Sequence, residues 1–413
     1  MITRRNGLLA AGAMLGAAAL PGSASASELP GSGDGWVGSW GAATCSGITE
    51  LGSAALTVRN VVHTSLGGPA IRLRLSNAFG TATFTPTAVT VGIPVSAGSA
   101  EAKEIVPVTF DGLLAITIPV GAEVISDPVP LAVAPESDLL VSVGVAAGTN
   151  PATFHLHATQ VNYVADGDDH AADLAGTAFS TTTDSWFYVT GVDVRSSGAR
   201  GTVVCLGDSI TDGVTSTVGA DDRWPDYLAR RLLKLPPQQR FGVLNAGISG
   251  NRVLLDGAAL APGYAAAGQS AVARVQRDVL SRTNVRTLIL FEGINDLIWL
   301  PSQLDPQQIT GGLRQIIQQA HAVGVRVISA TLTPAGGYTG GGFGAPQEAA
   351  RQAVNAWIRH SGVPDAVLDF DAVLRDPSDP GVIAPWYDSG DNLHPNDAGY
   401  QALANSINLA DLS

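Results

Sequence analysis

"GTVVCLGDSITDG", residues 201–213, joins a strand-forming run to a turn that carries a single serine. The apolar run 202–206 is followed directly by Gly207, Asp208 and Ser209. A short apolar run bounded by turn residues is typical of a strand that is buried on both faces of a parallel sheet. Ser209 is therefore predicted at the carboxyl end of such a strand, where open α/β sheets place their ligands.

The chain from residue 201 to its end alternates between strand and helix patterns. Apolar runs follow at 241–246, 286–293, 325–332 and 365–370, and helical patterns lie at 223–235, 269–282, 306–323, 346–360 and from Pro395 onward. Apolar strands separated by helices indicate a parallel, doubly wound sheet with helices on both faces. Residues 201–413 are therefore predicted to form one α/β domain.

The chain before this domain has a different pattern. In "AIRLRLSN", residues 70–77, Ile71, Leu73 and Leu75 alternate with arginines, and similar short runs are separated by Gly- and Pro-containing turns. Regular short strands with such turns predict a β-sandwich or jelly roll. We expect an all-β accessory domain over 27–194 and a linker, "RSSGAR", over 195–200.

The first 26 residues are expected to be a signal peptide and not part of the fold. They have a basic start, a short Ala/Leu run and an A-x-A pattern at Ala24-Ser25-Ala26. The expected location is secreted or extracellular. The adjacent Arg4 and Arg5 make twin-arginine export one of the possible routes.

Composition excludes several classes of partner. The 413 residues are 45% hydrophobic and 14% charged, and removing residues 1–26, which contain Arg4 and Arg5 but no acid, changes the formal net charge from −13 to −15. So acidic a chain is not expected to bind nucleic acid or to associate stably with anionic membranes. Export would permit a disulfide between Cys45 and Cys205, but Cys205 lies in an apolar run, which favours a buried thiol.

Three further polar segments follow predicted strands. "NAGISGN" (245–251) contains Gly250, whose N–H could point into a cleft, and "EGINDL" (292–297) contains the Asn295 amide. "DNLHPNDAGY" (391–400) places Asp391 three residues before His394, close enough to orient its ring. Each segment alone also suits an ordinary turn.

Together the segments "GDSI", "NAGISG", "GIND" and "DNLHP" resemble, in order and approximate spacing, the four blocks of the SGNH (GDSL) hydrolase family. The resemblance implies a flavodoxin-like α/β/α fold and ester hydrolysis without metal or cofactor. It implies that Ser209 is the nucleophile, His394 the general base and Asp391 its orienting acid. The Ser209 and Gly250 N–H groups and the Asn295 amide would form the oxyanion hole. The upstream half is similar to the β domain of some secreted bacterial members.

Two function classes remain open at this point. The first is a serine esterase on small-molecule or polysaccharide esters, with acyl or acetyl esters of carbohydrate and lipid esters as alternatives. The second is a secreted polysaccharide-binding protein without activity. His63, His155 and His157 are expected to face solvent and not to bind metal, because no Cys or acid stands at ligand spacing. The natural substrate and the oligomeric state stay open.

Overall fold

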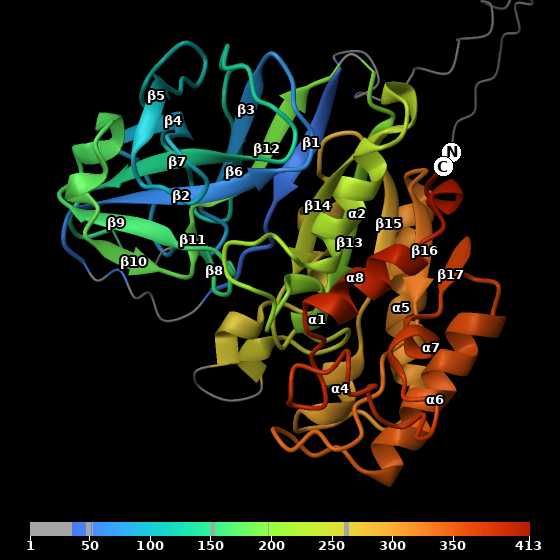
Figure 1. Ribbon diagram of the computed structural model, residues 1–413. Coiled ribbons are helices and arrows are strands. Elements are labelled where there is room, and N and C mark those ends of the chain that lie inside the picture. The colour runs from blue at the N-terminus through green and yellow to red at the C-terminus, as the bar shows by residue number, and fades with distance from the viewer. Residues whose placement is uncertain (1–34, 47–50, 52, 150–152, 197, 260–263) are drawn as a thin grey trace, which may run out of the picture.

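The computed structural model describes residues 35–413 except 47–50, 52, 150–152, 197 and 260–263, and it consists of two parts (Figure 1). The strand-rich part comes first in the chain, and the α/β part follows. The predicted signal peptide, residues 1–26, lies outside the described residues. Within the described part of the chain, no helix is both long and apolar enough to cross a membrane.

The second part is built on a parallel five-stranded sheet, which confirms the predicted fold class. The strand order is β14-β13-β15-β16-β17, the flavodoxin-like order 2-1-3-4-5. The strands are β13 (Gly201–Gly207), β14 (Phe241–Gly247), β15 (Val285–Phe291), β16 (Arg326–Ala330) and β17 (Ala366–Leu368). The order of the chain reverses between β13 and β15, and such a switch point is where these sheets bind ligands.

Helices cover both faces of this sheet. One face packs against α3 (Ala271–Val275), α5 (Pro306–Ala322) and α6 (Ala345–His360), and the other packs against α2 (Trp224–Leu233), α7 (Phe370–Leu374) and α8 (Asp397–Ser406). Two short helices, α1 (Ser209–Asp212) and α4 (Ile294–Ile298), directly follow the ends of β13 and β15. The last helix begins two residues later than its predicted start at Pro395, because Asn396 caps it by accepting the N–H of Gly399.

The first part consists of antiparallel sheets, as predicted. One has the order β1-β12-β3-β6 and the larger one β10-β9-β2-β7-β4-β5. Valine and leucine side chains of both sheets meet in one core, which makes this part a sandwich. The strands are β1 (Trp36–Gly41), β2 (Leu56–Thr64), β3 (Ile71–Ser76), β4 (Ala88–Pro94), β5 (Ala102–Pro107), β6 (Glu123–Ile125), β7 (Ser137–Val145), β9 (Asn162–Asp166), β10 (Thr181–Thr183) and β12 (Val189–Arg195).

A third, two-stranded sheet corrects one prediction. His155 was expected to face solvent, but it lies on the short strand β8 (Phe154–His155), which pairs with β11 (Trp186–Phe187). His155 is 3% exposed because this short sheet lies against the α/β part of the chain. Cys45 and Cys205 are buried free thiols.

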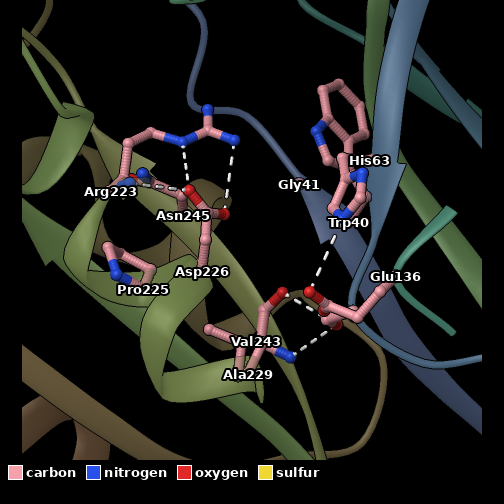
Figure 2. Close-up of a pocket in the computed structure, with 11 residues that line it drawn as sticks. Trp40, Gly41, His63, Glu136, Arg223, Pro225, Asp226, Ala229, Val243 and Asn245 are labelled. Atoms are coloured by element: carbon pink, nitrogen blue, oxygen red, sulfur yellow. Dashed lines mark hydrogen bonds and ion pairs between the residues drawn. The ribbon is translucent and has the colours of Figure 1, made fainter. Parts of the chain in front are cut away.

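The two parts meet along β14, the strand at the edge of the parallel sheet (Figure 1). Ser65, which follows β2, accepts a hydrogen bond from the Val243 N–H at 3.0 Å. Gly242 lies so close to β1 that a Cβ there would overlap the carbonyl oxygen of Gly38. A small cavity of about 20 Å³ remains in this interface, with the Arg223–Asp226 pair on one side and His63 and Glu136 on the other (Figure 2). The first part thus covers this edge of the parallel sheet.

Candidate active site

Ser209 is the first residue of α1, which begins just beyond the carboxyl end of β13, as the sequence predicts. Asp208 caps this helix by accepting the N–H of Ile210 at 2.9 Å, which fixes the turn from strand to helix. Gly207 must be glycine because a Cβ there would collide with the carbonyl oxygen of Phe291 and with Thr211. Ser209 as a residue is 4% exposed.

The structure brings Ser209, His394 and Asp391 into one line of hydrogen bonds. The Oγ of Ser209 lies 2.8 Å from the Nε2 of His394, and the Nδ1 of His394 lies 2.6 Å from the Oδ2 of Asp391. The other oxygen of Asp391 accepts the backbone N–H groups of Leu393 and His394. The carboxylate is therefore held from two sides and orients the imidazole toward the serine.

These hydrogen bonds keep Asp391 ionised. Partial burial pushes the pKa of this carboxyl upward, but hydrogen bonds from the side chain and backbone of His394 outweigh that effect. The result is a pKa well below the ordinary value for an aspartate. Asp391 is thus an ionised hydrogen-bond acceptor at any pH at which the protein is expected to work.

Contacts outside the line hold the serine loop and the histidine loop together. The hydroxyl of Thr215, beyond α1, donates to the carbonyl of Pro395 at 2.8 Å. The buried hydroxyl of Tyr400, on α8, donates to the carbonyl of Val214 at 2.6 Å. Because these bonds join residues about 180 positions apart, they fix the distance between two loops that the sequence alone leaves unrelated.

Gly250 lies in the loop after β14 with a φ of +78°. The N–H of Asn251 donates to the carbonyl of Ile248, so residues 248–251 form a tight turn whose third position needs a positive φ. No described residue accepts a hydrogen bond from the Gly250 N–H. This donor is therefore available to a bound group, as the predicted oxyanion role requires.

Asn295 is on α4 beyond β15, beside the Gly250 loop. Its Nδ2 donates to the carbonyl of Asn251 at 3.0 Å, and its Oδ1 accepts from the indole of Trp299. One of the two Nδ2 hydrogens has no partner in these bonds. The role of Trp299 in orienting this amide was not expected from the sequence, although its position four residues after Asn295, at the end of α4, was a signal.

Buried charges lie beneath the serine. The Arg274 guanidinium donates to the carbonyls of Gly207 and Ala246, at the ends of β13 and β14. Burial raises the pKa of Asp208 to about 7, although the Ile210 N–H and His394 act in the opposite direction. Burial, and then the charge of Asp208, also raise the pKa of Glu292 well above its ordinary value. Arg274 lies 3.8 Å from Glu292 and does not outweigh these two effects.

A pocket of about 280 Å³ lies beside α4. The rings of Tyr264 and Trp299 are 5.7 Å apart in its wall, and Leu300 extends from it with 77% exposure. Aromatic and aliphatic walls of this kind bind acyl chains or the apolar faces of sugar rings. The residues that line it are Tyr264, Ile298, Trp299, Leu300, Gly341 and Gly342.

One group of potential metal ligands stands apart from this site. His63, Asp138 and Asp221 each place one ligand atom within 4.8 Å of the others. The Nδ1 of His63 is 2.8 Å from Asp138 and 3.2 Å from Asp221. Burial lowers the pKa of His63, but hydrogen bonds to Asp138 and Glu136 outweigh it and raise the pKa to about 10. The positive charge of the protonated imidazole thus balances the negative carboxylates. The prediction that His63 faces solvent is wrong, because its side chain is largely buried.

The comparison with protein families identifies the α/β part of the chain. Residues 205–402 match the model of the GDSL-like lipase/acylhydrolase family. The class defined by fold and family is that of the carboxylic ester hydrolases. The catalytic roles of Ser209, His394, Asp391, Gly250 and Asn295 remain predictions.

Solved structures with a similar fold include three bacterial proteins. A GDSL-like lipase from Bacteroides thetaiotaomicron is 19% identical, with a TM-score of 0.36, over 51% of this chain and 87% of that one. A lipolytic G-D-S-L family member from Veillonella parvula is 20% identical, with a TM-score of 0.35, over 50% and 94%. An acetylxylan esterase from Geobacillus stearothermophilus is 20% identical, with a TM-score of 0.38, over 53% and 95%. No curated protein matches the chain.

Proposed function

We propose that this protein is a secreted serine esterase that cleaves carboxylic esters through a Ser209–His394–Asp391 triad, with acyl esters of carbohydrate as its leading substrates. The observation that carries the proposal is the unbroken line of hydrogen bonds from Ser209 Oγ through both nitrogens of His394 to Asp391. Such a line activates a serine hydroxyl that is otherwise a weak nucleophile. It lies at the switch point of the sheet, where substrates of this fold class bind.

The reaction follows from the positions of the groups. His394 Nε2 accepts the proton of Ser209 as its Oγ forms a bond to the ester carbonyl carbon. The N–H groups of Ser209 and Gly250 and the Asn295 amide stabilise the oxyanion. His394 then gives the proton to the leaving alcohol, and an acyl-enzyme remains. Water, deprotonated by His394, attacks this ester and releases the acid and the free serine.

The pocket beside α4 supports a substrate with a short acyl group or a sugar ring at this site. Its aromatic wall is linked to the proposed oxyanion hole through Trp299, which bonds Asn295. Lipid esters remain the alternative, and the exposed Leu300 at the rim is the observation that favours them. Hydrolysis of acetyl to palmitoyl esters, together with acetate release from acetylated xylan, separates the two. We expect acetyl esters to give the highest kcat/KM.

Covalent labelling tests the chemistry itself. A fluorophosphonate should form a one-to-one adduct at Ser209, and the Ser209→Ala variant should give none. A folded protein with no adduct and no ester hydrolysis would refute the triad and favour the polysaccharide-binding alternative. Secretion is tested separately: the exported protein should begin at residue 27, and an intact residue 1 in the culture medium would contradict the signal peptide.

A further inference from the structure

His155 belongs to the β-sandwich part, but its side chain reaches the loop that carries the nucleophile. It stands on β8, and its ring packs 5.3 Å from that of Trp186 on β11. Its Nε2 is 2.8 Å from the Oδ1 of Asp212, the last residue of α1. Both side chains are 4% exposed. The contact is therefore a buried link from one part of the chain to the helix that begins at Ser209.

The surroundings of His155 require two protons on the ring. The Nδ1 faces the carbonyl oxygen of Ala43 at 2.7 Å, and the Nε2 faces the carbonyl of His157 at 3.1 Å as well as Asp212. Carbonyl and carboxylate oxygens can only accept, so both nitrogens must donate. Burial lowers the pKa of His155, but the charge and hydrogen bond of Asp212 raise it by more. The link is a buried imidazolium–carboxylate pair.

Asp212 also bonds the loop that contains Gly250. Its second oxygen, Oδ2, accepts the backbone N–H of Ser249 at 3.0 Å. The strand that leads into this loop, β14, touches α1 at its last residue, Gly247, where a Cβ would overlap the backbone nitrogen of Asp212. One carboxylate thus joins three segments: β8, the helix of the nucleophile and the turn of the proposed oxyanion donor.

We propose that His155 is a positioning residue for catalysis, which acts from the β-sandwich part through Asp212 to fix the Gly250 turn relative to Ser209. The inference rests on the proposed function. On this proposal, the β-sandwich part helps to hold the active-site residues of the α/β part in position.

The physical reason is the narrow tolerance of an oxyanion hole. A displacement of about 1 Å costs about 10²-fold in rate, because donors act only when they meet the developing charge. Without His155, the buried negative charge of Asp212 loses the hydrogen bond and the positive charge that β8 supplies. Buried unpaired charges are costly, so the carboxylate would turn toward water or toward the nearby Arg223 and release Ser249.

The test compares kcat per reactive serine in four variants. His155→Leu and Asp212→Asn should each lower kcat on a short-chain ester about 10- to 100-fold, with KM changed less than about threefold. Dividing the rate by the end-point fluorophosphonate labelling removes any unfolded fraction. His155→Gln should recover part of the loss, since its amide can still donate to Asp212. His157→Gln, at a partly exposed histidine two residues away, is the matched control and should match the wild type.

The double variant His155→Leu/Asp212→Asn decides whether His155 acts through Asp212. If it does, the double variant loses little more than either single variant, because neighbouring residues of one network are not additive. The proposal would be overturned if the double variant lost kcat by the product of the two single-variant losses. It would also be overturned if both single variants kept the wild-type kcat per labelled serine. Should His155→Leu fail to fold, His155→Gln takes its place in the same cycle. A failure of the proposed function looks different, since the wild type itself would then show no Ser209-dependent hydrolysis.

Discussion

The indole N–H of Trp299, the residue directly after α4, donates to the Oδ1 of Asn295 at 2.9 Å. An asparagine amide can be turned by 180° with little change in shape, and this bond selects the orientation in which Nδ2 faces the loop that contains Gly250 and Asn251. Trp299 therefore has two roles, since it also forms part of the wall of the pocket beside α4.

This relationship predicts graded effects on turnover. Asn295→Ala should lower kcat about 10²–10³-fold, because an oxyanion donor is lost. Trp299→Phe keeps the ring but releases the amide, so we expect a smaller loss of about 10-fold, mostly in kcat. Trp357→Phe, on α6, is the matched control. Steady-state kinetics with circular dichroism checks the prediction, and unchanged kcat for Asn295→Ala would contradict the assigned role.

The pocket predicts an effect on binding and not on chemistry. Tyr264 lines the wall but bonds none of the proposed catalytic groups. Tyr264→Ala should raise KM for the preferred ester about 10-fold and leave kcat within about threefold, because it removes binding common to ground state and transition state. Trp386→Ala, an exposed ring outside this pocket, serves as control. Equal KM values for Tyr264→Ala and wild type across all chain lengths would exclude the pocket as substrate site.

The His63 cluster predicts a loss of stability at alkaline pH. The folded chain raises the pKa of His63 from 6.5 to about 10, so it binds this proton more tightly than the unfolded chain does. The stabilisation is therefore complete below pH 6.5 and is lost as pH rises through about 10. The charged groups around the ring are Glu136, Asp138, Asp221, Asp226 and Arg230, which itself pairs with Glu136.

Thermal unfolding at several pH values measures this effect. His63→Gln should lower the unfolding free energy at pH 7 by about 2 kcal/mol, since a charged hydrogen bond is removed. It should also flatten the decline of Tm between pH 7 and 10. His321→Gln, which removes a histidine–aspartate pair on the surface, controls for the loss of a histidine. A wild-type Tm that does not fall between pH 7 and 10 would show that His63 is not held protonated.

Replacing a carboxyl by an amide is predicted to have a small effect on stability at one buried carboxyl near Arg274 and a large effect at another. The raised pKa of Glu292 favours its neutral form, so we expect Glu292→Gln to alter the unfolding free energy by less than about 1 kcal/mol. Asp278 has a lowered pKa: burial raises it, but Arg277 and Arg274 outweigh burial. Asp278→Asn should therefore cost about 3–5 kcal/mol, because it leaves buried arginines unpaired. Denaturant unfolding tests both, and a large effect of Glu292→Gln would show an ionised carboxylate.

The α/β part was predictable because its signals are local. Strand ends, turn residues and an acid three residues before a histidine all lie within short windows, and parallel strands bring such windows to one sheet edge. Ser209, Asp391 and His394 were predicted in this way, and the structure places their side chains within hydrogen-bond distance of one another. His155 and His63 were misjudged because their burial depends on a partner surface more than 55 residues away in the chain, which alternation in a strand does not encode. Asp212 lies within the stretch 201–213, but its proposed role could not be inferred without the knowledge that His155 contacts it.

The contacts of Ser65 and Gly38 along β14 have a consequence for how this protein can be produced. An uncovered strand edge is a template for pairing with another chain. A fragment that starts at Gly201 would bare that edge and is expected to self-associate, whereas the whole polypeptide stays dispersed. We therefore expect the α/β part to aggregate when it is produced alone. Engineered forms of this esterase have to retain the β-sandwich part.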